Sequence, residues 1–67
     1  MKIMIKQFRE EKGLTQRKVA NMVGVSRQTI NAVENGKYSP TVALAYKLVK
    51  VFDKKYIEEL FIEDENE

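Results

Sequence analysis

The segment from Gln16 to Gly36 constrains the fold most, because its residues fit two short helices joined by one tight turn. Gly24 lies at the bend, where a positive φ would end the first helix. Thr15 and Ser26 precede the two helical runs and can cap them through their side-chain oxygens. The apolar positions keep one face of each helix on the same side of the bend; they are Val19, Val23, Val25, Ile30 and Val33. The segment therefore predicts a helix-turn-helix unit with one shared core.

The stretch LTQRKVANMVGVSRQTINAVENGK resembles the DNA-binding segment of the λ-repressor and Cro-like helix-turn-helix regulators, also called the XRE family. The resemblance rests on Gln16, the small Ala20, Gly24 at the turn and the closing ENGK. It extends over about residues 5–60. It implies an all-α, compact five-helix λ-repressor-like DNA-binding domain of the short single-domain type, occupying residues 1–67. A small helical bundle with similar capping residues would explain the apolar positions but not the polar ones.

Length and composition narrow the function. A chain of 67 residues buries a modest fraction of its surface, so association with a second copy is a natural source of stability. The absence of Cys and His removes disulfides, thiolate metal sites and the commonest acid–base residue, so we expect no enzyme, cofactor, metal site or small-molecule ligand. The longest apolar run, Val42 to Tyr46, is too short to cross a membrane or to direct export. We therefore expect a cytoplasmic protein.

Charge divides the chain into two parts. Residues 1–55 hold all twelve Lys and Arg against four acids, a net +8, whereas residues 56–67 hold six acids and no base. A basic body suits DNA, because neutralised phosphates release their condensed counterions. The acidic C-terminal end, 58–67, should point away from the DNA. The alternative is that the basic residues only solubilise the helix faces.

Helical periodicity and stop signals place the remaining elements. Helices are expected at 4–12, 16–23, 27–35, from Pro40 to about Phe52 with Ser39 as cap, and at 56–61. The apolar ends, 1–3 and 60–62, are left over. In some short members of the family that this chain resembles, such ends pair as a small antiparallel sheet beside a two-fold interface, and we expect the same here. The C-terminal dimer patch would consist of Phe52, Tyr56, Ile57, Leu60 and Phe61.

The outward face of the helix 27–35 carries side chains suited to the floor of the DNA major groove. Arg27 suits guanine O6 and N7, Gln28 suits adenine N6 and N7, and the Ala32 methyl suits a thymine methyl; Asn31 can contact a base or a nearby phosphate. We expect these four to contact bases. The expected phosphate contacts are Gln16, Arg17, Lys18, Ser26, Thr29, Asn35, Lys37 and Tyr38.

The resemblance also implies an ion pair between Arg9 and Glu34 that fixes geometry more than it adds net stability; the alternative is two exposed charges. Taken together, the sequence predicts a homodimeric regulator that binds double-stranded DNA sequence-specifically, expected to be a repressor of a palindromic operator. An antitoxin-like module of a different class is the alternative. It would bind a protein partner through the acidic segment while its helix-turn-helix regulates its own gene.

Overall fold

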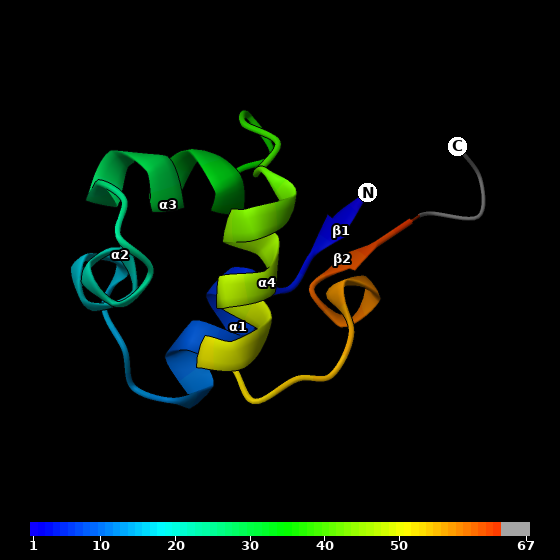
Figure 1. Cartoon of the computed structure of the whole chain (residues 1–67), viewed down its shortest axis with the longest axis horizontal. Helices are drawn as coiled ribbons and strands as arrows, with labels where there is room; N and C mark the ends of the chain where they lie inside the picture. The colour runs from blue at the N-terminus through cyan, green and yellow to red at the C-terminus, as the bar shows by residue number, and fades with distance from the viewer. Residues whose placement is uncertain (64–67) are drawn as a thin grey trace.

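The computed structural model describes residues 1–63; residues 64–67 of the predicted acidic end 58–67 lie outside the described part. Four α-helices surround one core, and a two-stranded sheet lies at one side (Figure 1). In chain order the elements are β1 (Lys2–Ile3), α1 (Ile5–Glu11), α2 (Gln16–Val23), α3 (Arg27–Glu34), α4 (Val42–Val51), the 3₁₀ turn η1 (Ile57–Glu59) and β2 (Phe61–Ile62).

Local capping sets the bounds of α2 and α3. The Thr15 hydroxyl accepts a hydrogen bond from the backbone N–H of Lys18 at 3.0 Å, and the Ser26 hydroxyl accepts one from that of Thr29 at 3.1 Å. Gly24 ends α2 at φ +78°, a left-handed conformation that glycine adopts without steric penalty. These contacts agree with the caps and the stop expected from the sequence, so the helix-turn-helix forms for the predicted local reasons.

The core lies where α1, α2, α3 and α4 meet, and the 3₁₀ turn closes it with Leu60. Its fully buried side chains come from every part of the chain: Ile5, Val19, Ile30, Val33, Leu48 and Leu60. Ala20, 1% exposed, lies at the α2 face that packs on the core, where a larger side chain would need space that is already filled. This core holds α3 in place through Ile30 and Val33, which leaves the opposite face of α3 toward solvent.

The start of α4 differs from the prediction. The cap is Thr41, whose hydroxyl accepts from the backbone N–H of Leu44 at 3.1 Å, so α4 begins at Val42 and not at Pro40. Two capping residues, Ser39 and Thr41, are close together here, and the second one satisfies the helix N-terminus. The later start leaves the apolar face of α4 on the core, since Leu44, Leu48 and Phe52 are buried.

The expected fifth α-helix at 56–61 is wrong. The segment forms the three-residue turn η1, because Glu59 accepts hydrogen bonds from the backbone N–H groups of Lys55 at 2.7 Å and Tyr56 at 2.9 Å. The chain then extends as β2. The expected strand pair is confirmed: β1 and β2 are antiparallel, with Lys2 opposite Ile62 and Ile3 opposite Phe61. Backbone pairing with the opposite end of the chain thus replaces further helix.

Candidate nucleic-acid interface

The free face of α3 carries the predicted base-contacting side chains. Arg27, Gln28 and Asn31 are exposed and Ala32 is half-buried, while Ile30 and Val33 on the other face are 0% and 1% exposed. Figure 1 shows α3 along one edge of the molecule, with α2 and α4 on its inner side. A helix placed in this way can present its outer face to a groove without rearrangement of the core.

Hydrogen-bonded side chains connect α1, α2 and α3 beneath that face. Arg9 Nε lies 2.7 Å from Glu34 Oε2, and its Nη2 donates to Glu34 Oε1 at 3.2 Å. Gln16 Nε2 also donates to Glu34 Oε1, at 3.0 Å, and Gln16 Oε1 accepts from Arg27 Nη1 at 3.2 Å. Arg9 Nη1 in addition donates to the Leu14 carbonyl at 2.9 Å. We call Arg9, Glu34, Gln16 and Arg27 the relay.

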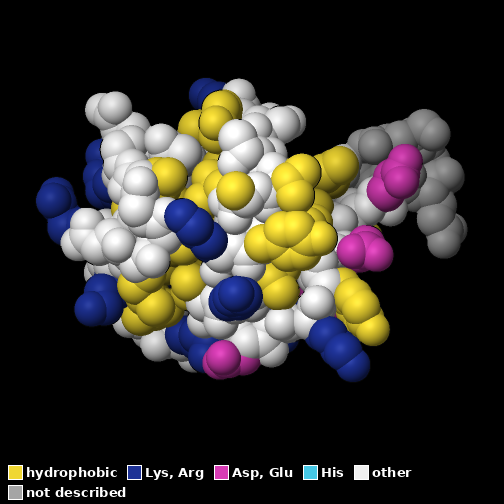
Figure 2. Space-filling model, viewed as in Figure 1, with side chains coloured by type: hydrophobic (Ala, Val, Ile, Leu, Met, Phe, Trp, Pro, Cys, Tyr) yellow, Lys and Arg dark blue, Asp and Glu magenta, His cyan; other side chains and the backbone are white. Residues whose placement is uncertain are grey.

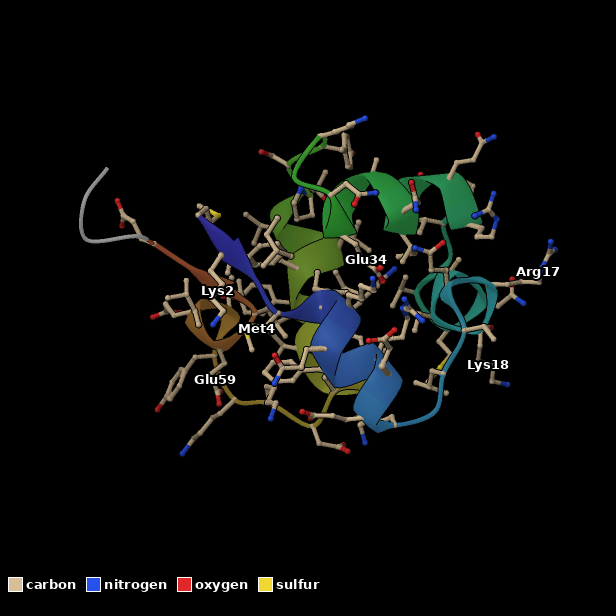
Figure 3. All side chains as sticks on the ribbon, turned by 180° about the vertical axis from the view of Figure 1, so that it is seen from behind. Lys2, Met4, Arg17, Lys18, Glu34 and Glu59 are labelled. Carbon is tan, nitrogen blue, oxygen red and sulfur yellow. The ribbon has the colours of Figure 1, made fainter. Side chains whose placement is uncertain are left out.

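The buried end of the relay is an ion pair. The side chains of Arg9 and Glu34 are 12% and 3% exposed, so water screens them poorly. The hydrogen bond that Arg9 donates to Glu34 raises the pKa of Arg9 above its ordinary value, against the opposing effect of burial. Figure 3 shows Glu34 among α1, α2 and α3, whereas Arg17 and Lys18 point outward from α2. The pair therefore fixes how α1 and α2 lie against the end of α3.

A shallow hollow of about 570 Å³ opens beside the relay, at the first turn of α2. Its lining residues are Arg9, Gly13, Leu14, Thr15, Gln16, Arg17 and Arg27. The exposed Arg17 and Lys18 lie in that first turn, where the positive end of the helix dipole adds to their charge. Arg17 and Arg27 in the lining, together with the positive end of the α2 dipole, suit an anionic group such as a phosphate.

The remaining predicted phosphate contacts lie at the two ends of α3. Ser26 and Thr29 share a hydrogen bond between their hydroxyl oxygens at 3.0 Å. Asn35 Nδ2 donates to the Asn31 carbonyl at 2.9 Å and to Asn31 Oδ1 at 3.2 Å, so these two side chains brace each other. Lys37 and Tyr38 follow α3 and are exposed. All eight predicted phosphate contacts thus come from α2, from α3 and from the residues directly beside them.

Sequence reasoning missed the contact between Gln16 and Arg27. Both side chains come from the first residue of a helix, and the tight turn at Gly24 brings these two helix starts together. The sequence predicts a phosphate contact for Gln16, and in this structure the Gln16 amide also bridges Glu34 and Arg27. One feature of the sequence could have revealed this contact. The first residue of α2, Gln16, can both donate and accept hydrogen bonds, and the first residue of α3, Arg27, is a cation.

The predicted dimer patch needs correction. Phe52 and Leu60 are 2% and 0% exposed and belong to the core of this chain, so they offer almost no surface to a second copy. Tyr56 is exposed, and Ile57 and Phe61 are half-buried. The apolar surface on this side includes exposed residues that the prediction omitted: Met1, Val42, Tyr46 and Ile62.

A hollow of about 250 Å³ interrupts that surface, and its lining is almost entirely apolar. The lining residues are Met1, Ser39, Pro40, Val42, Ala45, Ile57 and Phe61. Figure 2 shows hydrophobic side chains gathered over α4 and toward the two strands. We define the apolar face by the residues Met1, Val42, Tyr46, Ile57, Phe61 and Ile62.

Within residues 1–63, no helix is both long enough and apolar enough to cross a bilayer. No group of three or more His, Cys, Asp or Glu side chains in the same residues is placed to hold a metal ion.

Residues 5–60 match the family model described as helix-turn-helix. A relative from Methanothermobacter thermautotrophicus, named as an HTH-type transcriptional regulator, is 46% identical over 66 residues, which are 98% of this chain and 96% of the relative. One from Methanocaldococcus jannaschii with the same description is 48% identical over the whole of both chains. Among solved structures, the restriction-modification controller protein C.AhdI from Aeromonas hydrophila superposes with a TM-score of 0.76 at 30% identity, over 85% of each chain.

Proposed function

The chain belongs to the helix-turn-helix family of λ-repressor and Cro-like DNA-binding transcriptional regulators, and on this basis we propose that it is a cytoplasmic repressor. It binds a palindromic operator as a homodimer, with α3 in the major groove. One observation carries the proposal: the exposed Arg27, Gln28 and Asn31 lie on the outer face of a helix that a buried ion pair and the core hold in place. A rigid helix with donors and acceptors on its free face is suited to direct contact with base edges.

Each side chain has a role in this proposal. Arg27 donates to guanine O6 and N7, Gln28 pairs with adenine, Ala32 contacts a thymine methyl, and Asn31 contacts a base or an adjacent phosphate. The backbone phosphates are held by residues around both helix starts and after α3, six of them exposed and two, Gln16 and Thr29, half-buried. The exposed six are Arg17, Lys18, Ser26, Asn35, Lys37 and Tyr38. The first group sets the sequence preference, and the second sets the register and the salt dependence.

The homodimer would form through the apolar face. Four of its residues are large and exposed: Met1 at 60%, Val42 at 68%, Tyr46 at 58% and Ile62 at 42%. A contiguous apolar surface of this kind, with a hollow of about 250 Å³ within it, supports association with an identical surface on a second copy. In the proposed dimer the two α3 helices enter successive major grooves, roughly 34 Å apart.

Selection of bound duplexes from a random DNA pool tests this proposal. The expected result is an inverted repeat whose half-site centres lie about 10 base pairs apart. A single unrepeated motif would contradict the dimer, and no enriched motif at moderate salt would contradict sequence-specific binding. In the latter case a search for a protein partner would take precedence over the search for an operator.

A further inference from the structure

The relay connects Glu34, which lies away from the free face of α3, to Arg27 on that face. Its side chain is only 3% exposed and faces Arg9 and Gln16, so it is not placed to contact a base. Gln16 nevertheless extends the contact outward, to Arg27 on the free face of α3. Glu34 and Arg27 thus lie at opposite ends of the same helix and are joined through a residue of α2.

We propose that Glu34 is a positioning residue that sets the base preference of the protein through Gln16 and Arg27. The inference rests on the proposed function, in which Arg27 contacts a base. It also rests on hydrogen-bond polarity. An ionised carboxylate only accepts hydrogen bonds and a guanidinium only donates them, whereas an amide has one end of each kind. Glu34 therefore requires the NH₂ of Gln16, which turns Gln16 Oε1 toward Arg27.

This polarity fixes the orientation of the amide from both ends. The Nε2 of Gln16 donates to Glu34 Oε1 at 3.0 Å, and Oε1 accepts from Arg27 Nη1 at 3.2 Å. Arg9 in turn holds the carboxylate through two hydrogen bonds and is itself anchored by its bond to the Leu14 carbonyl. An exposed arginine would otherwise lose much rotamer freedom on binding, and a guanidinium that is held beforehand loses less.

Replacement of Glu34 by Gln tests the inference by changing polarity at nearly constant size. The shortest contact, from Arg9 Nε to Oε2 at 2.7 Å, favours a carbonyl oxygen at that position, which places the new NH₂ toward Gln16. The new NH₂ then faces two donors, Arg9 Nη2 and the NH₂ of Gln16, so Arg9 keeps only its contact through Nε, and Gln16 must turn its oxygen inward and its NH₂ toward Arg27. The NH₂ of Gln16 and the guanidinium of Arg27 are both donors, so Arg27 would lose its hydrogen bond to Gln16.

The measurement compares dissociation constants for a selected duplex and for one changed at the base pair that Arg27→Ala identifies as its contact. We expect Glu34→Gln to lower this discrimination about three- to tenfold, the range expected from the loss of one hydrogen bond. Affinity for unrelated duplex should change less than about twofold. Combined with Arg27→Ala, Glu34→Gln should have no further effect on the discrimination, because the effect acts through Arg27.

Glu11→Gln is the matched control. It removes the same charge from an exposed side chain that accepts a hydrogen bond from Gln7 on its own helix, and it should leave discrimination unchanged. Circular dichroism and thermal melting establish that each variant is folded. If Glu34→Gln does not fold, Glu34→Asp replaces it, since a carboxylate one methylene shorter cannot reach both Arg9 and Gln16, and we expect the same fall in discrimination.

Two results would overturn the inference: unchanged discrimination in the folded variant, or an equal loss when Arg27 is already Ala. Failure of the proposed function is distinct from both. In that case the unmodified protein would show no discrimination between duplexes, and Arg27→Ala would identify no base pair.

Discussion

Arg9 Nε and Glu34 Oε2 lie 2.7 Å apart and join the first helix, α1, to the last residue of α3. Their side chains are 12% and 3% exposed, so removal of either one leaves the other charge in a place with little water. We expect Arg9→Ala to lower the free energy of unfolding by roughly 3 kcal/mol, as for other buried pairs that lose one partner. Urea unfolding followed by circular dichroism measures the change.

The control for this prediction is Lys6→Ala, an exposed cation on the same helix, which should change the free energy of unfolding by less than about 0.5 kcal/mol. Equal small effects from both variants would contradict a geometric role for the pair. The double variant Arg9→Met with Glu34→Leu should recover much of the lost stability, because no unpaired charge then remains in the buried site.

The Glu59 carboxylate makes the C-terminal turn sensitive to acid. Hydrogen bonds from the backbone N–H groups of Lys55 and Tyr56 hold the pKa of Glu59 below its ordinary value of 4.5. A depressed folded pKa stabilises the fold fully above pH 4.5, and this stabilisation is lost as the pH falls through the folded pKa. We expect the β1–β2 pairing next to this turn to weaken in acid, as followed by the NMR signals of Phe61 and Ile62.

Glu59→Gln should remove that part of the acid dependence, because a neutral amide can still accept the capping hydrogen bonds but does not titrate. Glu58→Gln is the matched control, since Glu58 is the exposed neighbour and accepts neither of the two backbone hydrogen bonds that Glu59 accepts. An identical acid dependence in Glu59→Gln and in the unmodified protein would show that the capping contact is unimportant.

Substitutions of Gln28 and Lys37 should distinguish a residue that contacts a base from one that contacts a phosphate. Gln28→Ala should relax the preference at one base pair and cost roughly 1–3 kcal/mol on the selected site. Lys37→Ala, its control, should weaken all duplexes similarly and reduce the salt slope by about one. Binding titrations by fluorescence anisotropy at several salt concentrations measure both. Unchanged base preference in Gln28→Ala would place the recognition face elsewhere on α3.

The apolar face predicts how a dimer can be dissociated without unfolding the chain. Val42 is 68% exposed at the start of α4, where an acidic side chain suits the helix dipole. Val42→Glu should therefore fold and sediment as a monomer, while Ala43→Glu, which is also exposed but does not line the hollow, should remain a dimer. Sedimentation equilibrium distinguishes them. A dimer that tolerates Val42→Glu would exclude this face as the interface.

The parts of the fold that the sequence predicts are those decided by neighbouring residues. The caps at Thr15 and Ser26 and the stop at Gly24 depend on side chains within one helical turn, so local chemistry is enough to place them. The predicted cap of α4, Ser39, is wrong because Thr41, two residues later, offers the same hydroxyl oxygen and caps the helix.

The features that local sequence patterns missed or left undecided depend on contacts between distant segments. Phe61 falls within both the expected helix 56–61 and the expected strand pair, and it extends as a strand because Ile3, at the opposite end of the chain, supplies a backbone partner. Leu60 is buried for a related reason: its carbonyl accepts from the backbone N–H of Met4 at 2.8 Å, which holds it against the core. The Gln16 contact with Arg27 likewise required two helix starts to be placed in space.

The most direct test of the account compares two duplexes that carry the same selected half-site as an inverted repeat. In one the half-site centres lie about 10 base pairs apart, and in the other about 15, which turns the second half-site to the opposite side of the DNA. The account predicts tight binding of two chains to the first duplex and affinity close to that of a single half-site for the second. Equal affinity for both duplexes would contradict a two-fold dimer that places its α3 helices in successive major grooves.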